Sequence, residues 1–255
     1  MYASISNFNS EYSVLIVVAM EAEAAPFVER LKLQKRDDFF PSQVPFVAFS
    51  GEHEGCNLTV VTNGKDSVYG SDVDNVGTVP ASLVTFLSLS QPGADIDLVL
   101  NAGTCGGFQR KGAEIGNVFL TTGVANHDRR IPIPPFIPYG IGRLESVAAP
   151  NLAALHSFKT GVCTTGNSLD KTVQDDEHML ANDASVKDME AAAIIWSAQM
   201  FNTPYLGVKV VTDIVDGDRP THEEFMENLG TAAESLQDAL PKVIEYVCGR
   251  NKGEL

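Results

Sequence analysis

The segment Val208-Lys-Val-Val-Thr-Asp-Ile-Val-Asp-Gly-Asp218 gives the strongest indication of the fold. Its first half is apolar on both faces, a pattern typical of a strand in the middle of a layered sheet. Asp213 lies at the end of this run, and the residues after it have the composition of a turn. Because ligands of layered α/β folds gather where central strands end, this carboxyl group also indicates a functional site.

Similar runs alternate with helical patterns along most of the chain. Strands are predicted over residues 14–19, 46–49, 58–62, 97–100, 117–120, 161–164 and 205–211. Helices are predicted over residues 21–31, 80–89, 175–182, 190–201 and 223–247, and Pro241 should kink or split the last of them. This alternation predicts an α/β fold, a three-layer α/β/α sandwich. We expect one domain over residues 13–255 and a flexible N-terminal segment over residues 1–12.

Composition limits the classes of ligand. The chain has 255 residues, of which 44% are hydrophobic, and 18 basic against 33 acidic residues give a net charge of −15. This charge opposes binding to nucleic acid or to an anionic membrane, so we expect a neutral or cationic small ligand. No apolar run approaches the roughly 20 residues of a membrane-spanning helix.

The cysteines and the N-terminus bear on the compartment. Cys56, Cys105, Cys163 and Cys248 are widely spaced and form no C-x-x-C pair, so four reduced thiols are expected. The first residues lack the basic head and apolar stretch of a signal peptide. Both observations favour a cytoplasmic location.

Two further carboxyl groups lie at junctions like that of Asp213. Glu23 follows the apolar run 14–20, and Glu190 opens the helical run 189–200. Each glutamate could simply favour the positive end of a helix, and Asp213 could cap a turn. Asp213, Asp216 and Asp218 lack the ligand number and spacing of a calcium loop. The indication of a site therefore comes from three carboxyls at strand ends, not from any one of them.

Three other segments are open to more than one interpretation. The Gly-rich run 101–107 could be a ligand cradle or a tight turn. Residues 164–170 are most simply a strand-to-helix connection capped by Asn167 or Ser168. Residues 127–130, His-Asp-Arg-Arg, could bind an anion, or could be a solvated or subunit-facing loop.

The motifs together resemble a known family. AMEAEAAP, VGTVPAS, NAGTCGGF, HDRRIPIP, TGNSL, ANDASVKDMEAAA, KVVTDIVDGDRPT and EEFMENL occur in order from about residue 13 to the C-terminus. They resemble the nucleoside phosphorylase-like superfamily, and within it the plant-type members of the 5′-methylthioadenosine/S-adenosylhomocysteine nucleosidases. The resemblance implies a single catalytic domain with a mixed β-sheet, usually a homodimer, that hydrolyses methylthioadenosine to adenine and methylthioribose.

The resemblance also implies roles for individual residues. Glu23 would activate the attacking water, Asp213 would protonate adenine N7, and Glu190 would hold the ribose hydroxyls. The implied substrate-binding residues are Met189 beneath the sugar, Met20 in the 5′-alkylthio pocket, Lys209 and Thr104 near the water, Gly106 beside the base, Leu169 stacked on adenine, and Asp170 with its backbone at the adenine edge. Leucine replaces the aromatic residue that bacterial relatives carry at position 169.

The chemistry explains why carboxyl groups are needed. Departure of adenine leaves an oxocarbenium-like sugar, and adenine leaves only if its ring accepts a proton, so a general acid and a water-activating carboxylate are the minimal apparatus. Asp213 must be protonated, which predicts a raised pKa, whereas Glu23 and Glu190 must stay ionised. These proton transfers need no cofactor or metal.

Two alternatives to hydrolysis remain at the level of sequence. Related phosphorylases use phosphate held by arginines, but Asn101 and the acidic Glu23 stand where cations would be needed. A non-catalytic storage or binding relative would lose one or more of the carboxyls, and all three are present. Met20 and the apolar run after His127 favour methylthioadenosine, and S-adenosylhomocysteine stays open as a second substrate.

Overall fold

A computed structural model describes residues 12–248 of the chain. The segment expected to be flexible therefore lies outside the described residues, apart from Tyr12, which begins the first strand. No helix among residues 12–248 is long and apolar enough to cross a membrane.

Strands and helices alternate as the sequence predicts. The strands are β1 (Tyr12–Val18), β2 (Gln34–Lys35), β3 (Val47–His53), β4 (Cys56–Thr62), β5 (Leu98–Gly107), β6 (Val118–Asn126), β7 (Leu144–Glu145), β8 (Lys159–Thr165), β9 (Ala184–Asp188) and β10 (Tyr205–Ile214). The helices are α1 (Glu21–Arg30), α2 (Thr78–Leu89), α3 (Ile137–Ile141), α4 (Pro150–His156), α5 (Val173–Ala181), α6 (Ala191–Met200) and α7 (Thr221–Val247), with short 3-10 turns η1 (Gln109–Lys111) and η2 (Pro134–Phe136).

The strands form one mixed sheet, in the order β10-β6-β8-β9-β5-β1-β4-β3-β2. β1 pairs in parallel with β4 and β5, whereas β5 and β9 are antiparallel. A further parallel pairing of β10 with β5 closes β5, β10, β6, β8 and β9 into a ring. The expected α/β class with a mixed sheet is confirmed.

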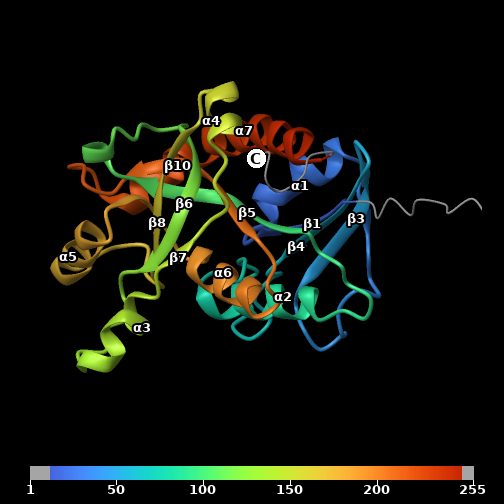
Figure 1. The fold of residues 1–255 in the computed structure, drawn as a ribbon, viewed down its shortest axis with the longest axis horizontal. Helices are drawn as coiled ribbons and strands as arrows, with labels where there is room; N and C mark the ends of the chain where they lie inside the picture. The colour runs from blue at the N-terminus through green and yellow to red at the C-terminus, as the bar shows by residue number, and fades with distance from the viewer. Residues whose placement is uncertain (1–11, 249–255) are drawn as a thin grey trace, which may run out of the picture.

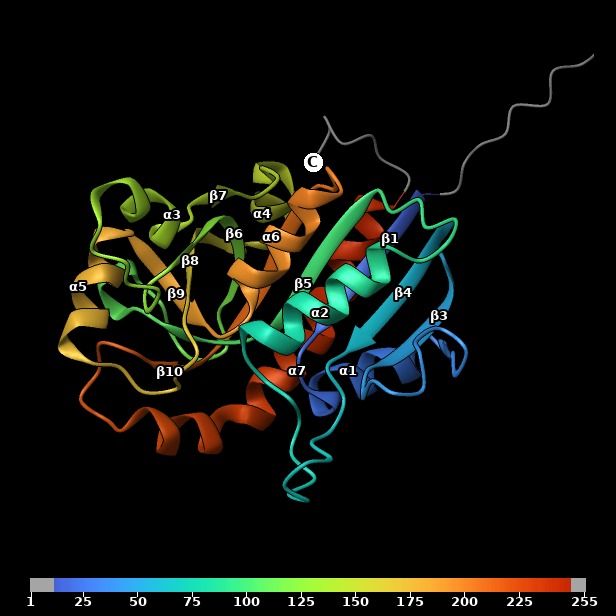
Figure 2. The ribbon, with the colours of Figure 1, turned by 90° about the horizontal axis from the view of Figure 1, so that it is seen from below.

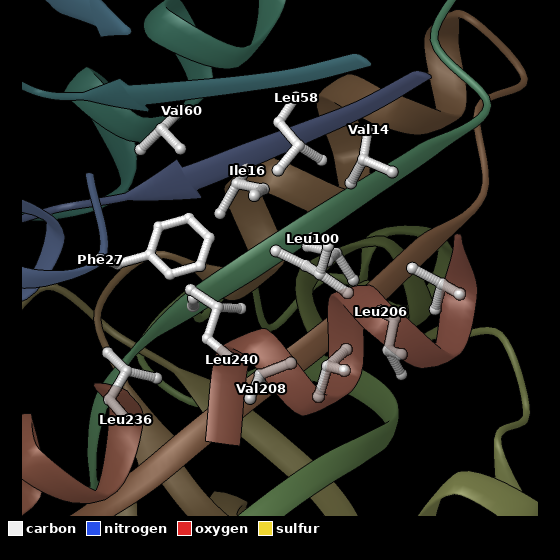
Figure 3. Close-up of a cluster of buried hydrophobic side chains, with 14 of the residues drawn as sticks. Val14, Ile16, Phe27, Leu58, Val60, Leu100, Leu206, Val208, Leu236 and Leu240 are labelled. Atoms are coloured by element: carbon white, nitrogen blue, oxygen red, sulfur yellow. The ribbon is translucent and has the colours of Figure 1, made fainter. Parts of the chain in front are cut away.

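Helices cover both faces of the sheet (Figure 1), as in a layered fold. On one face, α1 and α7 pack on apolar side chains of β1, β4, β5 and β10. Figure 3 shows Phe27 of α1 beside Ile16 of β1, and Leu236 and Leu240 of α7 belong to the same cluster. On the other face, α2 and α6 lie side by side (Figure 2), and the Ser197 hydroxyl of α6 donates to the Ser82 carbonyl of α2 (3.2 Å). This double burial explains why the central strands are apolar on both faces.

Several local expectations differ from the structure. The Gly-rich run 101–107 is not a tight turn, because β5 continues through it to Gly107. Helix α7 is not split, since it runs from Thr221 to Val247 with Pro241 inside it. The pattern also missed β9, which ends with the charged Lys187 and Asp188.

The expectation of four reduced thiols is wrong for one pair. Cys56 and Cys248 form a disulfide across 192 residues of sequence, whereas Cys105 and Cys163 are free and buried. The end of α7 packs where β4 begins, and this tertiary contact brings together two cysteines whose spacing gives no hint of pairing.

Candidate active site

The site lies where neighbouring strands diverge. β1 pairs with one edge of β5 as far as Asn101, and β9 joins the same edge at Gly106. The interval between the two exposes backbone of β5 to a cavity of about 280 Å³. Nine of the ten residues expected in the site line this cavity: Met20, Glu23, Thr104, Gly106, Leu169, Met189, Glu190, Lys209 and Asp213. The tenth, Asp170, lies outside the lining and borders a neighbouring hollow.

Glu23 stands in the first turn of α1, directly after β1. It is only 5% exposed, and the backbone N–H of Thr104 donates to its Oε1 (2.7 Å). Burial raises the pKa of Glu23, while the Thr104 hydrogen bonds and the charge of Lys209 act in the opposite direction. The structure thus brings a buried carboxyl group against the exposed interval of β5.

Glu190 is the N-cap residue of α6, but its side chain does not cap that helix. Its Oε1 instead accepts a hydrogen bond from the backbone N–H of Gly77 (2.8 Å), just before α2. Burial, followed by repulsion from Asp188, raises the pKa of Glu190 to about 7. The free protein therefore does not hold this group as firmly ionised as expected, because the cavity withdraws it from water.

Asp213 lies near the end of β10 and is 2% exposed. Burial raises its pKa, as expected for a proton donor, and Glu224 adds to the effect, whereas the Thr212 hydroxyl and the charge of Lys187 oppose it. Gly106 is its partner across the ladder, and a Cβ at that glycine would lie 2.7 Å from Asp213 Oδ2. The absence of a side chain at position 106 thus leaves room for the acid.

Lys209 of β10 is fully buried and pairs with Asp188 of β9 (Nζ to Oδ2, 2.8 Å). The same carboxylate accepts hydrogen bonds from the Thr165 hydroxyl (2.6 Å) and the Ala191 N–H (2.8 Å). Burial opposes the charged form of both groups, but their mutual attraction outweighs it: the pKa of Lys209 is raised and that of Asp188 is lowered, so the pair is charged. The pair connects two strands of the ring beside Glu23 and Glu190.

The loop after β8 differs from its expected role. Neither Asn167 nor Ser168 caps a following helix, because Thr172 and Asp175 form the capping box of α5. Asn167 Oδ1 instead accepts from the backbone N–H (3.0 Å) and the hydroxyl (2.8 Å) of Thr78, at the start of α2. The loop therefore joins the N-terminus of α2 and carries Leu169 to the cavity wall.

The cavity is also lined by residues that were not expected in the site, among them Val76, Lys187, Asp188, Thr212 and Phe225. Val76 and Phe225 are apolar residues in the segment before α2 and in α7, and no local pattern distinguishes them. A signal did exist for Lys187, because a charged residue inside a buried strand requires partners. Lys187 can be recognised in this way only if residues 184–188 are predicted to form a strand.

Arg129, Arg130 and Asp216, which lie outside the cavity, have structural partners. Arg130 pairs with Asp175 of α5, and Arg129 donates to the carbonyls of Tyr139 and Gly140. Asp216 accepts from the backbone N–H groups of Gln109 (2.6 Å) and Arg110 (3.1 Å) in η1. These contacts favour a structural role for the His-Asp-Arg-Arg loop and for the aspartate behind Asp213.

Known proteins share this sequence and fold. The family model of the phosphorylase superfamily matches residues 13–245. A 5′-methylthioadenosine nucleosidase of Arabidopsis thaliana is 46% identical, over 95% of this chain and 90% of its own. A 5′-methylthioadenosine/S-adenosylhomocysteine nucleosidase of the same plant is 45% identical, over 95% and 94%. The apo structure of an Arabidopsis thaliana 5′-methylthioadenosine nucleosidase superposes with a TM-score of 0.91 at 44% identity, covering 96% of this chain and 99% of that one. The chain therefore belongs to the phosphorylase superfamily, and within it to the family of the 5′-methylthioadenosine nucleosidases.

Proposed function

We propose that the protein hydrolyses the N-glycosidic bond of 5′-methylthioadenosine to adenine and 5-methylthioribose, as a step of methionine salvage. The observation that carries the proposal is the convergence of three buried carboxyl groups, Glu23, Glu190 and Asp213, on one cavity. The relatives at 45% and 46% identity bear the names of enzymes of this class.

Each carboxyl group has a distinct task. Glu23 takes a proton from the water as its oxygen forms a bond to the sugar C1′. Asp213 gives its proton to adenine N7 as the C1′–N9 bond breaks, and its raised pKa suits a donor at neutral pH. Glu190 holds the ribose hydroxyls, and the positive charge developing on the sugar favours its ionised form.

The remaining site residues serve binding. Thr104 and the Lys209–Asp188 pair keep Glu23 and the water in order. Met189 packs beneath the sugar, and Gly106 leaves space for the base. Leu169 stacks on adenine, and the backbone of Asp170 forms hydrogen bonds with the adenine edge. These assignments follow the family resemblance, and their support is that nine of the ten residues share one cavity.

Phosphorolysis is the alternative reaction on this scaffold. Asn101, at the position where phosphorylases use an arginine, donates to the Val17 carbonyl (3.2 Å) and accepts from the Tyr205 hydroxyl (3.2 Å). Glu23 would repel a phosphate ion in the same region. We expect adenine release from methylthioadenosine at the same rate with and without phosphate. Strict dependence of adenine release on phosphate would overturn the assignment of hydrolysis. A protein that binds adenine but forms no product over time would be a non-catalytic relative.

The 5′ substituent is the least constrained part of the substrate. Met20, Val76 and Phe225 give an apolar wall, which suits a methylthio group better than a charged amino-acid tail. We expect kcat/KM for methylthioadenosine to exceed that for S-adenosylhomocysteine by at least about tenfold, the worth of one poorly paired polar group. Equal values would show that the charged tail is accommodated.

A homodimer is the proposed assembly. Val79, Leu83 and Phe86 of α2 and Trp196 and Met200 of α6 are between 43% and 67% exposed on adjacent helices, forming an apolar surface. Such a surface favours a second copy of the chain as its occupant. We expect light scattering to give twice the mass of one chain and Leu83→Glu to give one chain. A wild-type mass of one chain would refute the dimer. The cytoplasmic location stays a prediction, which cell fractionation checks. The Cys56–Cys248 disulfide removes one of its two supports, so it rests on the N-terminal sequence alone.

A further inference from the structure

Lys187 is a buried cation that the proposed mechanism does not use. It lies in β9, is 5% exposed and borders the cavity. Its Nζ donates hydrogen bonds to two successive carbonyls of the loop after β8, those of Ser168 (2.8 Å) and Leu169 (2.7 Å). Since burying an ammonium group costs free energy even when it is hydrogen-bonded, its place beside the cavity calls for an explanation.

The two hydrogen bonds fix the conformation of Leu169. A peptide unit is planar, and its C=O and N–H point in opposite directions. The carbonyls of Ser168 and Leu169 belong to the two peptide planes on either side of the Leu169 Cα. One ammonium group therefore sets the backbone of Leu169, the direction of the side chain that forms the cavity wall, and the direction of the Asp170 N–H.

Lys187 also stands across from the proton donor. Gly106 of β5 is the ladder partner of Lys187 on one side and of Asp213 on the other. Residues paired across a ladder place their side chains on the same face of the sheet, so the cation and the acid flank a position without a side chain. The charge of Lys187 lowers the pKa of Asp213, against the larger effect of burial.

We propose that Lys187 is a positioning residue for the adenine end of the substrate: it clamps the backbone of Leu169 and Asp170 and places a fixed positive charge beside Asp213. The inference rests on the proposed function, in which Leu169 and Asp170 contact the base and Asp213 protonates it. It adds that Lys187 both positions the residues that bind the base and acts on Asp213, the group that protonates it.

The charged groups around this pair define the expected pH effect. Asp213 faces Lys187 from β9 and Glu224 from α7, in addition to the Thr212 hydroxyl on its own strand. Lys187 faces Asp213, Asp188 on its own strand, Asp170 in the loop and Asp175 on α5. Removing the cation leaves Asp213 with an acidic neighbour only, so the acid stays protonated to higher pH.

The test compares Lys187→Met, which removes the charge and the donors, with Lys187→Arg, which keeps both. For Lys187→Met we expect KM for methylthioadenosine to rise about tenfold or more with a smaller change in kcat, since about 1.4 kcal/mol of loop ordering is lost. The basic limb of the kcat/KM profile should move to higher pH, because the charge that lowers the pKa of Asp213 is gone. Lys187→Arg should restore the basic limb and most of the affinity.

Lys171→Met is the matched control, because Lys171 lies next to the same loop but pairs with Asp176 (2.9 Å). It should leave KM within about twofold and the basic limb in place. Lys187→Gln replaces Lys187→Met if the apolar variant does not fold, with the same expected pH shift. Unchanged KM and an unmoved basic limb in an active, folded variant would overturn the role of Lys187, whereas a wild-type protein that releases no adenine would overturn the proposed function itself.

Discussion

At the scale of single residues, the proton donor gives the most direct test. Asp213→Asn keeps the shape of the side chain and an oxygen that accepts from the Thr212 hydroxyl (2.8 Å), but it has no proton to give to adenine N7. We expect kcat to fall by about 10²- to 10⁴-fold, the usual contribution of one general acid. Steady-state release of adenine measures this loss, and an unchanged melting temperature shows that the variant is folded. Near-normal turnover would assign the donor to another group.

Glu190 connects activity with stability at the same scale. Its pKa is raised from 4.5 to about 7 in the folded protein, so the fold favours the protonated carboxyl. Below about pH 4.5 Glu190 is protonated in both the folded and the unfolded chain, so it does not reduce the free energy of unfolding. As the pH rises towards 7 the unfolded chain loses this proton first, and the free energy of unfolding falls. Glu190→Gln can still accept from the Gly77 N–H and removes the titration. We expect it to abolish turnover and to raise stability above pH 7 by up to about 3 kcal/mol.

Thermal unfolding at pH 5 and pH 8 checks the Glu190 prediction. The difference in melting temperature between the variant and the wild type should be small at pH 5 and clearly positive at pH 8. A difference that does not depend on pH would mean that Glu190 titrates near its ordinary value in the folded protein.

At the scale of elements, the course of β5 determines the shape of the site. A Cβ at Gly106 would lie 2.6 Å from a Val215 methyl group and 2.7 Å from Asp213 Oδ2, so Gly106→Ala must displace the acid. We expect kcat/KM to fall by about 10²-fold, a loss typical of displacing a catalytic group by about 1 Å. Gly103→Ala is the control in the same strand, because its Cβ would lie 3.4 Å from Glu23, an ordinary contact. Equal effects of the two substitutions would show that crowding at Asp213 is not the cause.

The same elements show how far the sequence predicts the structure. Seven strands and five helices follow from the apolar periodicity, because the spacing of apolar residues within each element indicates which side of it is buried. The course of β5 through Gly103, Gly106 and Gly107 does not, since glycine favours turns locally and the segment is kept extended by pairing with β10 and, at Gly106 and Gly107, with β9. Strand β9 escapes for a related reason: Lys187 and Asp188 interrupt its pattern, and their partners lie elsewhere in the chain.

The candidate site was predictable to a similar degree. Glu23 and Asp213 stand out because predicted strands end beside them, and Glu190 because it opens a predicted helix. The family motifs add Met20, Met189 and the other expected lining residues. The Asp188 partner of Lys209 and the clamp made by Lys187 depend on strands that close into a ring. Tertiary pairing of this kind leaves no local signature.

At the scale of the whole molecule, the disulfide ties the end of α7 to the start of β4. Cys56 is the ladder partner of Tyr12 at the beginning of β1, whereas the cavity lies beyond the other end of that strand, near Met20. Reduction should therefore destabilise the fold without altering the site. We expect dithiothreitol to lower stability by about 2 to 4 kcal/mol, as for other disulfides that close long loops, and to leave kcat/KM at 25 °C unchanged. Cys248→Ala is the matched control: its melting temperature should equal or fall below that of the reduced wild type and should not respond to dithiothreitol. A wild-type melting temperature that is insensitive to reductant would mean that the Cys56–Cys248 bond contributes nothing to holding α7 against the sheet.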